Sequence, residues 1–296
     1  DITWILDDWR LDRDASIRGG FGNYMDLSHA GRIGNTVTVN GKIPETFEVR
    51  AGERIRLRLI NAANARIFAL EFAGHQPRII ALDGQPVTPH EPEGGRIVLG
   101  PAMRADIILD MTGKPEQRHA VTDPFYRRLA YKLLDMVYAA EPLRATPLES
   151  EVRLPPNPLP EPDLATAARH EVLFSGGMMG NMRGMSRGMA WAINGVSQTE
   201  HVHEPLLTLQ RNSSNILRLV NDTAWHHPIH LHGHSFRVIS RNGKPTRHRE
   251  WLDTVLVAPR EITEIAFVAD NPGDWMFHCH ILELQAAGMM STIRVA

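Results

Sequence analysis

An internal repeat limits most strongly which folds this chain can adopt. A nearly constant shift along the sequence aligns turns, strands and charged residues of the first half with those of the second. The aligned pairs are Asn40-Gly41 with Asn194-Gly195, Arg58–Asn61 with Arg218–Asn221, His75 with His234, Arg78 with Arg237, Asp83-Gly84 with Asn242-Gly243, and Pro101–Ile107 with Pro259–Ile265. The repeat predicts that the chain contains two copies of one fold.

Short strand signals fill both copies. Alternating or β-branched runs are bounded by Asn-Gly and Asp-Gly dipeptides, which favour tight hairpin turns. The clearest runs are Thr36–Val39, Ile55–Ile60, Ile107–Leu109, Ile216–Val220 and Phe236–Ile239. Helical signals are short and lie near Tyr126–Leu133 and Ile281–Ala287. Regularly spaced short strands predict an all-β protein made of sandwiches or barrels.

A proline-rich stretch separates the two copies. Its prolines are Pro142, Pro147, Pro155, Pro156, Pro158, Pro160 and Pro162. Because proline lacks a backbone donor and fixes φ, this stretch is expected to form neither a helix nor a central strand. We predict a first domain over residues 1–140, a linker over 141–165 and a second domain over 166–296.

Charge and composition exclude two classes of protein. The 32 Lys and Arg residues against 34 Asp and Glu residues give a net charge of −2. A nucleic-acid binder would show a basic excess, so none is predicted here. No apolar run approaches the roughly 20 residues that cross a bilayer, so no membrane span is predicted. The sequence opens on Asp1 instead of Met, and we expect any targeting peptide to lie upstream.

The two copies differ most at a group of histidines. The second copy contains His226-His227-Pro228-Ile229-His230-Leu231-His232-Gly233-His234. The positions of His227, His230 and His232 are held in the first copy by Phe68, Glu71 and Ala73. The shared scaffold therefore does not require these imidazoles, and their presence indicates a function.

The spacing of these histidines is typical of metal ligands on strands. His230 and His232 lie two residues apart, so a strand presents both imidazoles on one face. His278 and His280 form a second such pair, and Cys279 between them points the other way. Two pairs on neighbouring strands could bind one side of a metal cluster, whereas Cys279 would ligate a separate metal. Only one residue would separate the two metals, which is a short covalent path for electrons.

These motifs resemble a known family. The run from His227 to His234, with His278-Cys279-His280-Ile281 and Gly288-Met289-Met290, resembles the two C-terminal copper signatures of the multicopper oxidases. That family includes laccases and bacterial cuprous oxidases, and the resemblance covers the whole chain. It implies cupredoxin-type Greek-key sandwiches, the first matching the copper-free middle domain and the second the C-terminal domain.

The resemblance also implies roles for individual residues. His227 and Cys279 would bind the mononuclear blue copper, with Met289 as its weak axial ligand. His230 would bind type 2 copper, and His232, His278 and His280 would bind type 3 copper. Asp253 matches an acidic position often found beside the mononuclear site, where it would hold a ligand imidazole in its tautomer. The alternative interpretation of Asp253 is an ordinary aspartate near a turn. The catalytic set is thus Cys279, His278, His280 and Asp253.

The blue-copper signature is incomplete. The family places a second histidine five residues after the cysteine, and Leu284 stands there in this chain. Leucine has no atom that ligates copper, so the site is expected to bind Cu(II) poorly and to favour Cu(I). The following position, often an acid thought to deliver protons in bacterial members, is Gln285.

The trinuclear cluster is also incomplete, because it needs eight histidines and this chain offers four. In the family the others come from two His-x-His motifs on another cupredoxin domain, and residues 1–140 contain no such motif. We expect a three-domain oxidase whose N-terminal domain is missing from this sequence; a separate partner chain is the alternative. A further pair, His201 and His203, is interpreted as an exposed strand face.

Met178–Met189 is rich in methionine and glycine. Thioethers favour Cu(I), and a similarly placed insert in bacterial cuprous oxidases feeds Cu(I) to the blue site. A non-specific flexible linker is the alternative interpretation of this segment.

The sequence therefore predicts the C-terminal two-thirds of a copper-dependent oxidoreductase, laccase-like or a cuprous oxidase. The parent enzyme would take single electrons from a phenolic substrate or Cu(I) and reduce O₂ to water, whereas this chain alone would be inactive. The resemblance implies a periplasmic or secreted location. The alternatives are an inactive copper-binding or storage protein, and an oxidase in which Leu284 was introduced to disable the site.

Overall fold

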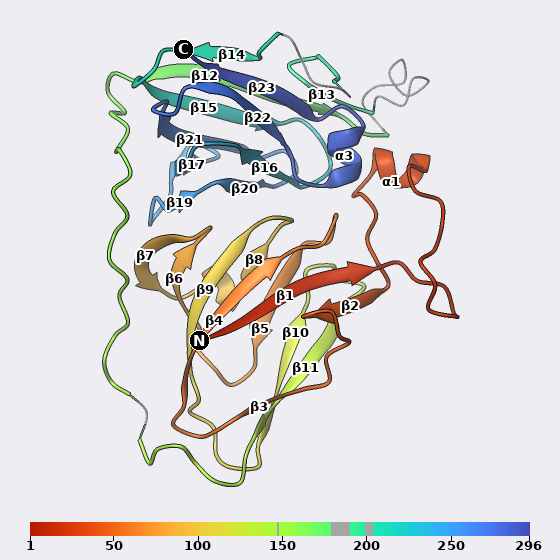
Figure 1. The fold of residues 1–296 in the computed structure, drawn as a ribbon, viewed down its shortest axis with the longest axis vertical. Helices are drawn as coiled ribbons and strands as arrows, with labels where there is room; N and C mark the ends of the chain where they lie inside the picture. Colours follow the sequence, from red (N-terminus) through yellow and green to blue (C-terminus); the bar gives the residue numbers. More distant parts are fainter. Residues whose placement is uncertain (147, 179–189, 199–203) are drawn as a thin grey trace. The chain divides into compact units, whose positions relative to one another are not determined.

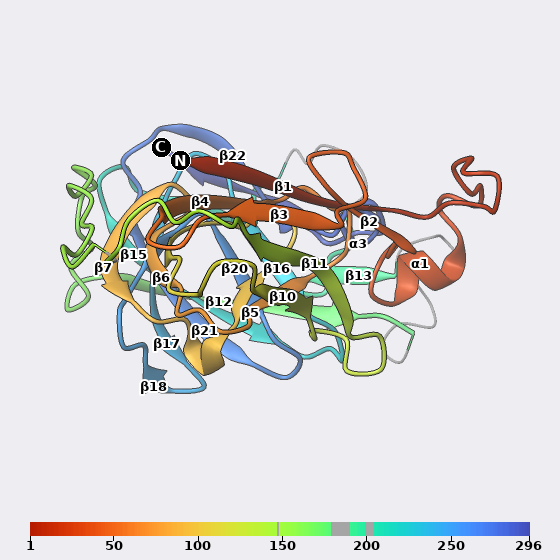
Figure 2. The same cartoon turned by 90° about the horizontal axis from the view of Figure 1, so that it is seen from below.

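A computed structural model of the chain describes residues 1–146, 148–178, 190–198 and 204–296. These residues fold almost entirely into β-strands, which confirms the predicted all-β class. They group into two compact units (Figures 1 and 2). Unit 1 comprises Asp1–Ile17 and Gly34–Pro156, and unit 2 comprises Arg18–Ile33 and Asn157–Ala296.

Unit 1 contains two sheets within the described residues. The first has the strand order β2 (Thr36–Val39), β1 (Ile2–Trp9), β4 (Arg54–Asn61), β9 (Arg104–Asp110), β6 (Arg78–Leu82) and β7 (Gln85–His90). The second has the order β3 (Thr46–Val49), β11 (Tyr131–Tyr138), β10 (Arg118–Asp123), β5 (Phe68–Phe72) and β8 (Ile97–Leu99). A short 3₁₀ turn, η1 (Glu93–Gly95), precedes β8.

Unit 2 repeats this plan in the part of it that the structure describes. One sheet has the order β13 (Trp191–Ile193), β12 (Ala168–Gly176), β15 (Ser214–Asn221), β21 (Ile262–Val268), β17 (Phe236–Arg241) and β18 (Lys244–Pro245), and β19 (Trp251–Leu252) also pairs with β17. The other has the order β14 (Leu207–Leu209), β23 (Met290–Val295), β22 (Gly273–Cys279), β16 (His227–Leu231) and β20 (Thr254–Val257).

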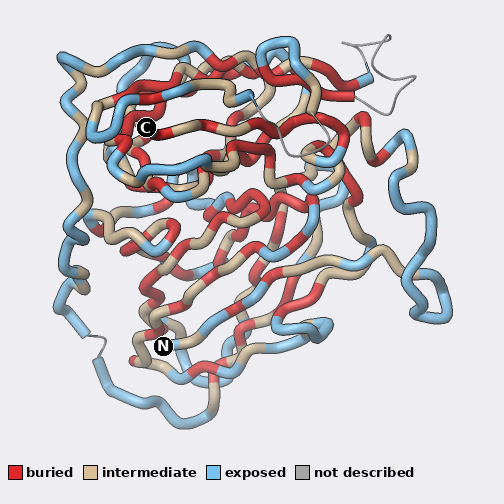
Figure 3. Tube along the Cα trace, turned by 45° about the horizontal axis from the view of Figure 1, so that its top comes forward, coloured by how far each residue is buried: buried red, intermediate tan, exposed pale blue. Residues whose placement is uncertain are grey.

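Alternating side chains build the core of each unit (Figure 3). Ile55, Leu57 and Leu59 on β4 are buried, whereas the intervening arginines point outward and pair with aspartates of neighbouring strands. This period of two is what a strand with one buried face requires. Burial of these apolar side chains, at roughly 25 cal/mol per Å², is the main stabilising contribution.

The four predicted turn dipeptides form tight turns. Both residues of each dipeptide have positive φ, for example 53° at Asn40 and 75° at Gly41. This geometry matches type I′ turns and favours asparagine followed by glycine. The Asn40 side chain accepts from the Ile5 N–H at 2.8 Å, and Asn194 repeats this contact with Leu173 at 2.7 Å. The repeat seen in the sequence therefore extends to side-chain hydrogen bonds.

The helix expectations had mixed outcomes. Helix α3 (Leu282–Ala286) confirms the helical turn predicted at Ile281–Ala287. The helical signal near Tyr126–Leu133 corresponds to one hydrogen-bonded turn, in which the Leu129 N–H donates to the Tyr126 carbonyl at 2.7 Å; it does not extend further, because β11 begins at Tyr131 and pairs with β10. Helix α1 (Tyr24–Ser28) was not predicted; it belongs to unit 2 and packs beside α3 (Figure 1). None of the described helices is long and apolar enough to span a membrane.

The proline-rich stretch has neither helix nor strand in its described residues, as predicted. Most of its residues are exposed, and it is largely pale blue in Figure 3. The boundary between the two compact units, between Pro156 and Asn157, lies inside it.

Candidate metal centre

Strands β16 and β22 bring the two predicted histidine pairs together in unit 2. The strands are antiparallel, with His230 opposite His278 and Ile229 opposite Cys279. The rings of His230 and His232 lie 4.8 Å apart between centroids, and the rings of His278 and His280 lie 5.4 Å apart. Nε2 of His232 lies 3.1 Å from Nε2 of His278. Four imidazoles thus meet on one face, as their spacing predicted.

Backbone and hydroxyl groups orient two of these imidazoles. Nδ1 of His230 lies 2.9 Å from the Asp253 carbonyl and 3.0 Å from Thr254 Oγ1. Thr254 Oγ1 donates to Asp253 Oδ1 at 2.8 Å, so it accepts from His230. Nδ1 of His278 lies 2.9 Å from the Cys279 carbonyl. Both rings therefore carry a proton on Nδ1 and leave Nε2 free as a ligand atom, which is the usual arrangement around a metal.

An open pocket of about 510 Å³ adjoins His230. Its wall includes Asp253, His234 and Asp270 as well as the His230 ring. Water and other small molecules can therefore reach the His230 side of the imidazole group.

Cys279 points to the opposite face, as predicted, and meets His227 in the core. The Sγ atom lies 3.8 Å from Nδ1 of His227, and both residues are 0% exposed. Metal–nitrogen and metal–sulfur bonds of about 2.0 and about 2.3 Å together reach about 4.3 Å, so one ion fits between the two atoms. The pair is therefore arranged as two ligands of a buried metal.

Burial keeps both groups neutral when no metal is bound. It lowers the pKa of His227 to about 3 and raises the pKa of the Cys279 thiol to about 12. Burial also lowers the pKa of His278 to about 4 and lowers the pKa of His232 and of His280. At neutral pH these four imidazoles are thus neutral and can bind a metal through the ring nitrogen that has no proton, whereas the thiol must lose its proton to bind a metal.

The chain that follows Cys279 returns to this residue at Met289. Met289 is fully buried, and its carbonyl accepts from the Cys279 N–H at 3.0 Å. Leu284 is fully buried as well and supplies no ligand atom. Gly288 has a φ of 116°, and a Cβ there would lie 2.5 Å from the Trp191 carbonyl oxygen. The glycine of the Gly288-Met289 motif is therefore required by a close backbone approach.

The remaining predicted residues are placed as follows. Asp253 lies beside His230, with Oδ1 at 3.5 Å from Nδ1. Met179–Met189 and the pair His201 and His203 lie outside the described residues. Within the described residues, no three His, Cys, Asp or Glu side chains converge closely enough to hold one metal ion by themselves.

Residues 18–33, which the sequence analysis assigned to the first domain, belong to unit 2 and contact this region. Trp191, whose ring packs against His227, donates from Nε1 to the Leu27 carbonyl at 2.6 Å. The Arg32 N–H donates to Glu283, next to Leu284, at 3.1 Å. No local pattern signals this placement, because the contacts join residues far apart in the sequence.

Unit 1 can be compared directly with the His227–Cys279 pair of unit 2. Strands β10 and β5 of unit 1 correspond to β22 and β16 of unit 2. Thr122 pairs with Glu71 in unit 1, as His278 pairs with His230 in unit 2. Asp123 therefore has the position that Cys279 has in unit 2. Tyr131 lies opposite Asp123, in the place of Met289, and its hydroxyl donates to Asp123 at 3.0 Å. A carboxylate bound by a tyrosine thus replaces the thiol.

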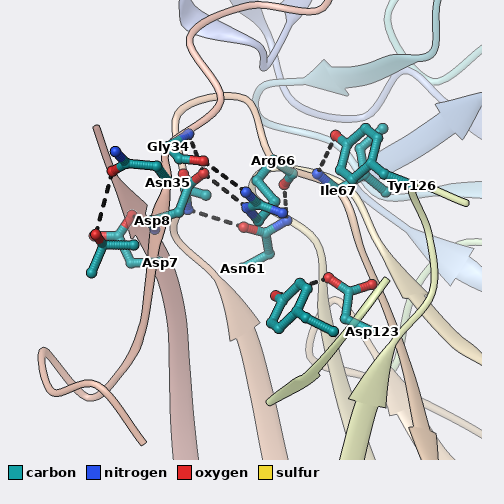
Figure 4. Close-up of polar contacts among 12 residues, drawn as sticks. Asp7, Asp8, Gly34, Asn35, Asn61, Arg66, Ile67, Asp123 and Tyr126 are labelled. Carbon is teal, nitrogen blue, oxygen red and sulfur yellow. Dashed lines mark hydrogen bonds and ion pairs between the residues drawn. The ribbon is translucent and has the colours of Figure 1, made fainter. Parts of the chain in front are cut away.

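A buried ion pair lies in the same part of unit 1 (Figure 4). Arg66 donates from Nε to Asp8 Oδ2 at 2.8 Å, and the Gly34 N–H donates to the same oxygen. The side chains of Asp8 and Arg66 are 0% and 7% exposed. Burial raises the pKa of Asp8 and outweighs the opposing effect of the Arg66 cation. In unit 1 this network of buried polar contacts occupies the region where unit 2 has its candidate metal ligands.

Comparisons with known proteins agree with this geometry. Two family models, both described as multicopper oxidase, match the chain, one over residues 1–140 and the other over residues 173–296. The chain belongs to the multicopper oxidase family. The matches cover both copies of the repeat, and the fold is that of the family's cupredoxin-like sandwiches.

Individual relatives place the chain within the family. It is 29% identical to the multicopper oxidase MmcO of Mycobacterium tuberculosis over 95% of this chain and 53% of the relative. It is similar to the structure of the multicopper oxidase of Pseudomonas thermotolerans, with 29% identity and a TM-score of 0.87. That match covers 100% of this chain and 68% of the other chain. It is also similar to the structure of the multicopper oxidase of Pseudomonas parafulva, with 30% identity and a TM-score of 0.80. That match covers 99% of this chain and 68% of the other chain. The chain spans about half the length of the curated relatives it matches.

Copper is the metal that this family implies, and the residues fit it in part. A nitrogen and a thiolate sulfur at His227 and Cys279 suit Cu(I), which accepts soft ligands at low coordination number. The trigonal set of two histidines and one cysteine that suits blue Cu(II) is not available with leucine at 284.

Breaking the buried Asp8–Arg66 pair should destabilise unit 1 strongly. Arg66→Met is expected to lower the free energy of unfolding by about 3–5 kcal/mol at pH 7, because it leaves a buried carboxylate unpaired. The loss should be smaller near pH 4. The raised folded pKa of Asp8 means that protonation stabilises the fold at low pH, and that this stability is lost as pH rises.

Urea unfolding of the wild type and the variant at both pH values measures these losses. Arg58→Met, which removes a cation from a half-exposed ion pair, is the matched control and should cost at most about 1 kcal/mol. An equal cost for Arg66→Met at both pH values would contradict this account of Asp8.

Copper binding should release one proton from Cys279. Because the thiol pKa of about 12 lies above the working range, the apparent Kd for Cu(I) should fall about tenfold per pH unit. Competition with a colorimetric Cu(I) chelator under anaerobic conditions measures this slope. His227 should add nothing to the slope, because its pKa of about 3 leaves the ring neutral throughout. Cys279→Ser should abolish the slope, and a pH-independent Kd of the wild type would show that the thiol is not a ligand.

Proposed function

We propose that the chain forms the middle and C-terminal domains of a copper-dependent oxidoreductase, laccase-like or a cuprous oxidase. The full protein would couple one-electron oxidation of a substrate to reduction of O₂ to water. The observation that carries the proposal is the pairing of β16 with β22. It buries a thiol and an imidazole on one face and gathers four imidazoles on the other.

Each residue has a distinct task in this proposal. His227 and Cys279, with Met289 at the weak axial position, would hold the mononuclear copper. His230 would hold type 2 copper, and His232, His278 and His280 would hold type 3 copper. Bound copper would supply the one-electron redox chemistry. Cys279 is bonded through the backbone to His278 and to His280, so a single peptide step would link the two metal positions.

The protein around these ligands controls their orientation and access. The Asp253 carbonyl and the Thr254 hydroxyl hold Nδ1 of His230, which directs Nε2 of that ring toward a metal. Asp253 acts here as a positioning residue, through its backbone as well as its carboxylate. The pocket beside His230 would admit O₂ and water.

The other four imidazoles of the cluster would come from an N-terminal cupredoxin domain or from a partner chain. The proposal assigns residues 1–140 to the copper-free domain, 141–165 to the linker and 166–296 to the copper-binding domain. A phenolic compound or Cu(I) would be the reducing substrate. Met178–Met189 would deliver Cu(I) to the blue site. The location would be periplasmic or secreted, as the family resemblance implies.

A second candidate function is a copper-binding or storage protein that no longer turns over. The observation that favours it is Leu284, which is fully buried and supplies no ligand at the position where the family signature has a histidine. Such a protein would hold Cu(I) at His227 and Cys279 without a route to O₂ chemistry.

Replacing Leu284 with histidine separates the two functions. If the remaining machinery is that of an oxidase, Leu284→His should give an intense blue charge-transfer band with Cu(II), because it restores two histidines and one cysteine. Absorption spectroscopy of the copper-loaded chain measures this band. Leu284→Ala is the matched control, since it opens the same space without adding a ligand, and it should stay colourless.

Oxygen consumption then tests catalysis. The blue variant should reduce O₂ once an N-terminal cupredoxin domain with two His-x-His motifs is supplied, and the unmodified chain with copper alone should not. A colourless Leu284→His variant would favour the storage protein. Oxygen consumption by the unmodified chain alone would contradict the need for the missing ligands.

A further inference from the structure

The nitrogen of His227 that faces away from Cys279 is held by a buried hydroxyl. Nε2 of His227 lies 2.8 Å from Oγ1 of Thr223, and Thr223 is only 1% exposed. Aromatic rings form other walls of this site, with Trp191 at 5.2 Å and Phe174 at 6.2 Å between ring centroids. The hydroxyl is therefore a polar contact set among apolar neighbours.

Two oxygens near this hydroxyl can only accept its proton. Thr223 Oγ1 donates to Oδ1 of Asn221 at 2.7 Å, and the Trp225 carbonyl is a second acceptor at 3.3 Å. The amide nitrogen of Asn221 donates to the carbonyls of Trp225 and Ala258, both at 2.8 Å, which fixes the orientation of the amide. Thr223 must therefore accept from Nε2–H of His227. The ring then carries its lone pair on Nδ1.

The first copy of the repeat contains the same turn without the hydroxyl. Asn61 Oδ1 accepts from the N–H of Ala63 at 3.0 Å, as Asn221 Oδ1 accepts from the N–H of Thr223 at 3.0 Å. Alanine therefore satisfies this contact of the turn, to which the Thr223 hydroxyl adds one from the Trp225 N–H at 3.2 Å. In that copy a phenylalanine replaces the imidazole, so the hydroxyl occurs in the copy that has a histidine to hold.

We propose that Thr223 is a positioning residue that fixes the tautomer of His227. With Nε2–H bound to the hydroxyl, Nδ1 presents its lone pair toward Cys279 Sγ, 3.8 Å away. A ring held in this way takes a metal ion between Nδ1 and Sγ without first moving its proton. The metal-binding part of this inference rests on the proposed function, whereas the tautomer belongs to the metal-free chain.

Long-range ¹H–¹⁵N correlation spectra of the metal-free chain, with ¹⁵N-labelled histidine, report the tautomer directly. The wild type and Thr223→Ser, which keeps the hydroxyl, should show His227 as Nε2–H with a slowly exchanging ring proton. Thr223→Val should lose the slow exchange and populate Nδ1–H. Thr223→Ala tests the same loss with the residue that already supports this turn in the first copy, in case the valine variant does not fold.

The matched control is Thr263→Val. Thr263 is also fully buried in unit 2, and its hydroxyl has no hydrogen-bond partner within the described residues. This variant should leave the His227 signals unchanged. An unchanged tautomer and ring-proton exchange in both Thr223→Val and Thr223→Ala would overturn the inference.

Cu(I) competition measures the consequence for metal binding. Loss of the hydroxyl should weaken Cu(I) binding about 10- to 100-fold, the usual effect of removing a group that orients a ligand, and serine should restore it. An unchanged affinity in both hydroxyl-free variants would overturn the positioning role. If the wild type binds no Cu(I) but the tautomer still responds to Thr223, the proposed function fails and the tautomer inference stands.

Discussion

The register between β16 and β22 is the constraint on which the candidate site depends. Because His230 lies opposite His278 and Ile229 opposite Cys279, the two strands sort their side chains onto two faces. A slip of one residue would turn Cys279 toward the imidazoles and the imidazoles toward the core. The buried apolar residues that alternate with the histidines, such as Leu231 and Phe277, oppose this slip, because they would become exposed. Ordinary core packing therefore holds two candidate metal positions one residue apart.

The two units show how one scaffold accepts different chemistry at the same place. Unit 2 buries neutral groups there, since burial shifts the pKa of His227 and Cys279 away from their charged forms. Unit 1 buries a charged pair, Asp8 and Arg66, together with a tyrosine-bound carboxylate at Asp123. A buried thiol can exchange its proton for a metal, whereas in unit 1 the Arg66 cation already faces the Asp8 carboxylate. Among the described residues, this difference makes unit 2 the candidate metal site.

Much of this arrangement could be predicted from the sequence because its signals are local. The positive φ of Asn-Gly turns and the two-residue spacing of His230 and His232 follow from backbone geometry alone. The placement of residues 18–33 in unit 2, and the hydroxyl at Thr223, could not be predicted in this way. Both depend on contacts between segments that only the fold brings together. The helical signal near Tyr126–Leu133 gives a single turn, because its last residues belong to β11 and pair with β10.

The most direct test of the central claim is X-ray absorption spectroscopy of the chain loaded with one equivalent of Cu(I). The account predicts a sulfur neighbour of copper at about 2.3 Å and a ring nitrogen at about 2.0 Å, by analogy with other metal–thiolate and metal–imidazole bonds. Cys279→Ser should remove the short sulfur contribution, and His227→Ala should weaken retention of the metal. A copper shell made only of imidazole nitrogens, unchanged by Cys279→Ser, would contradict a metal between His227 and Cys279.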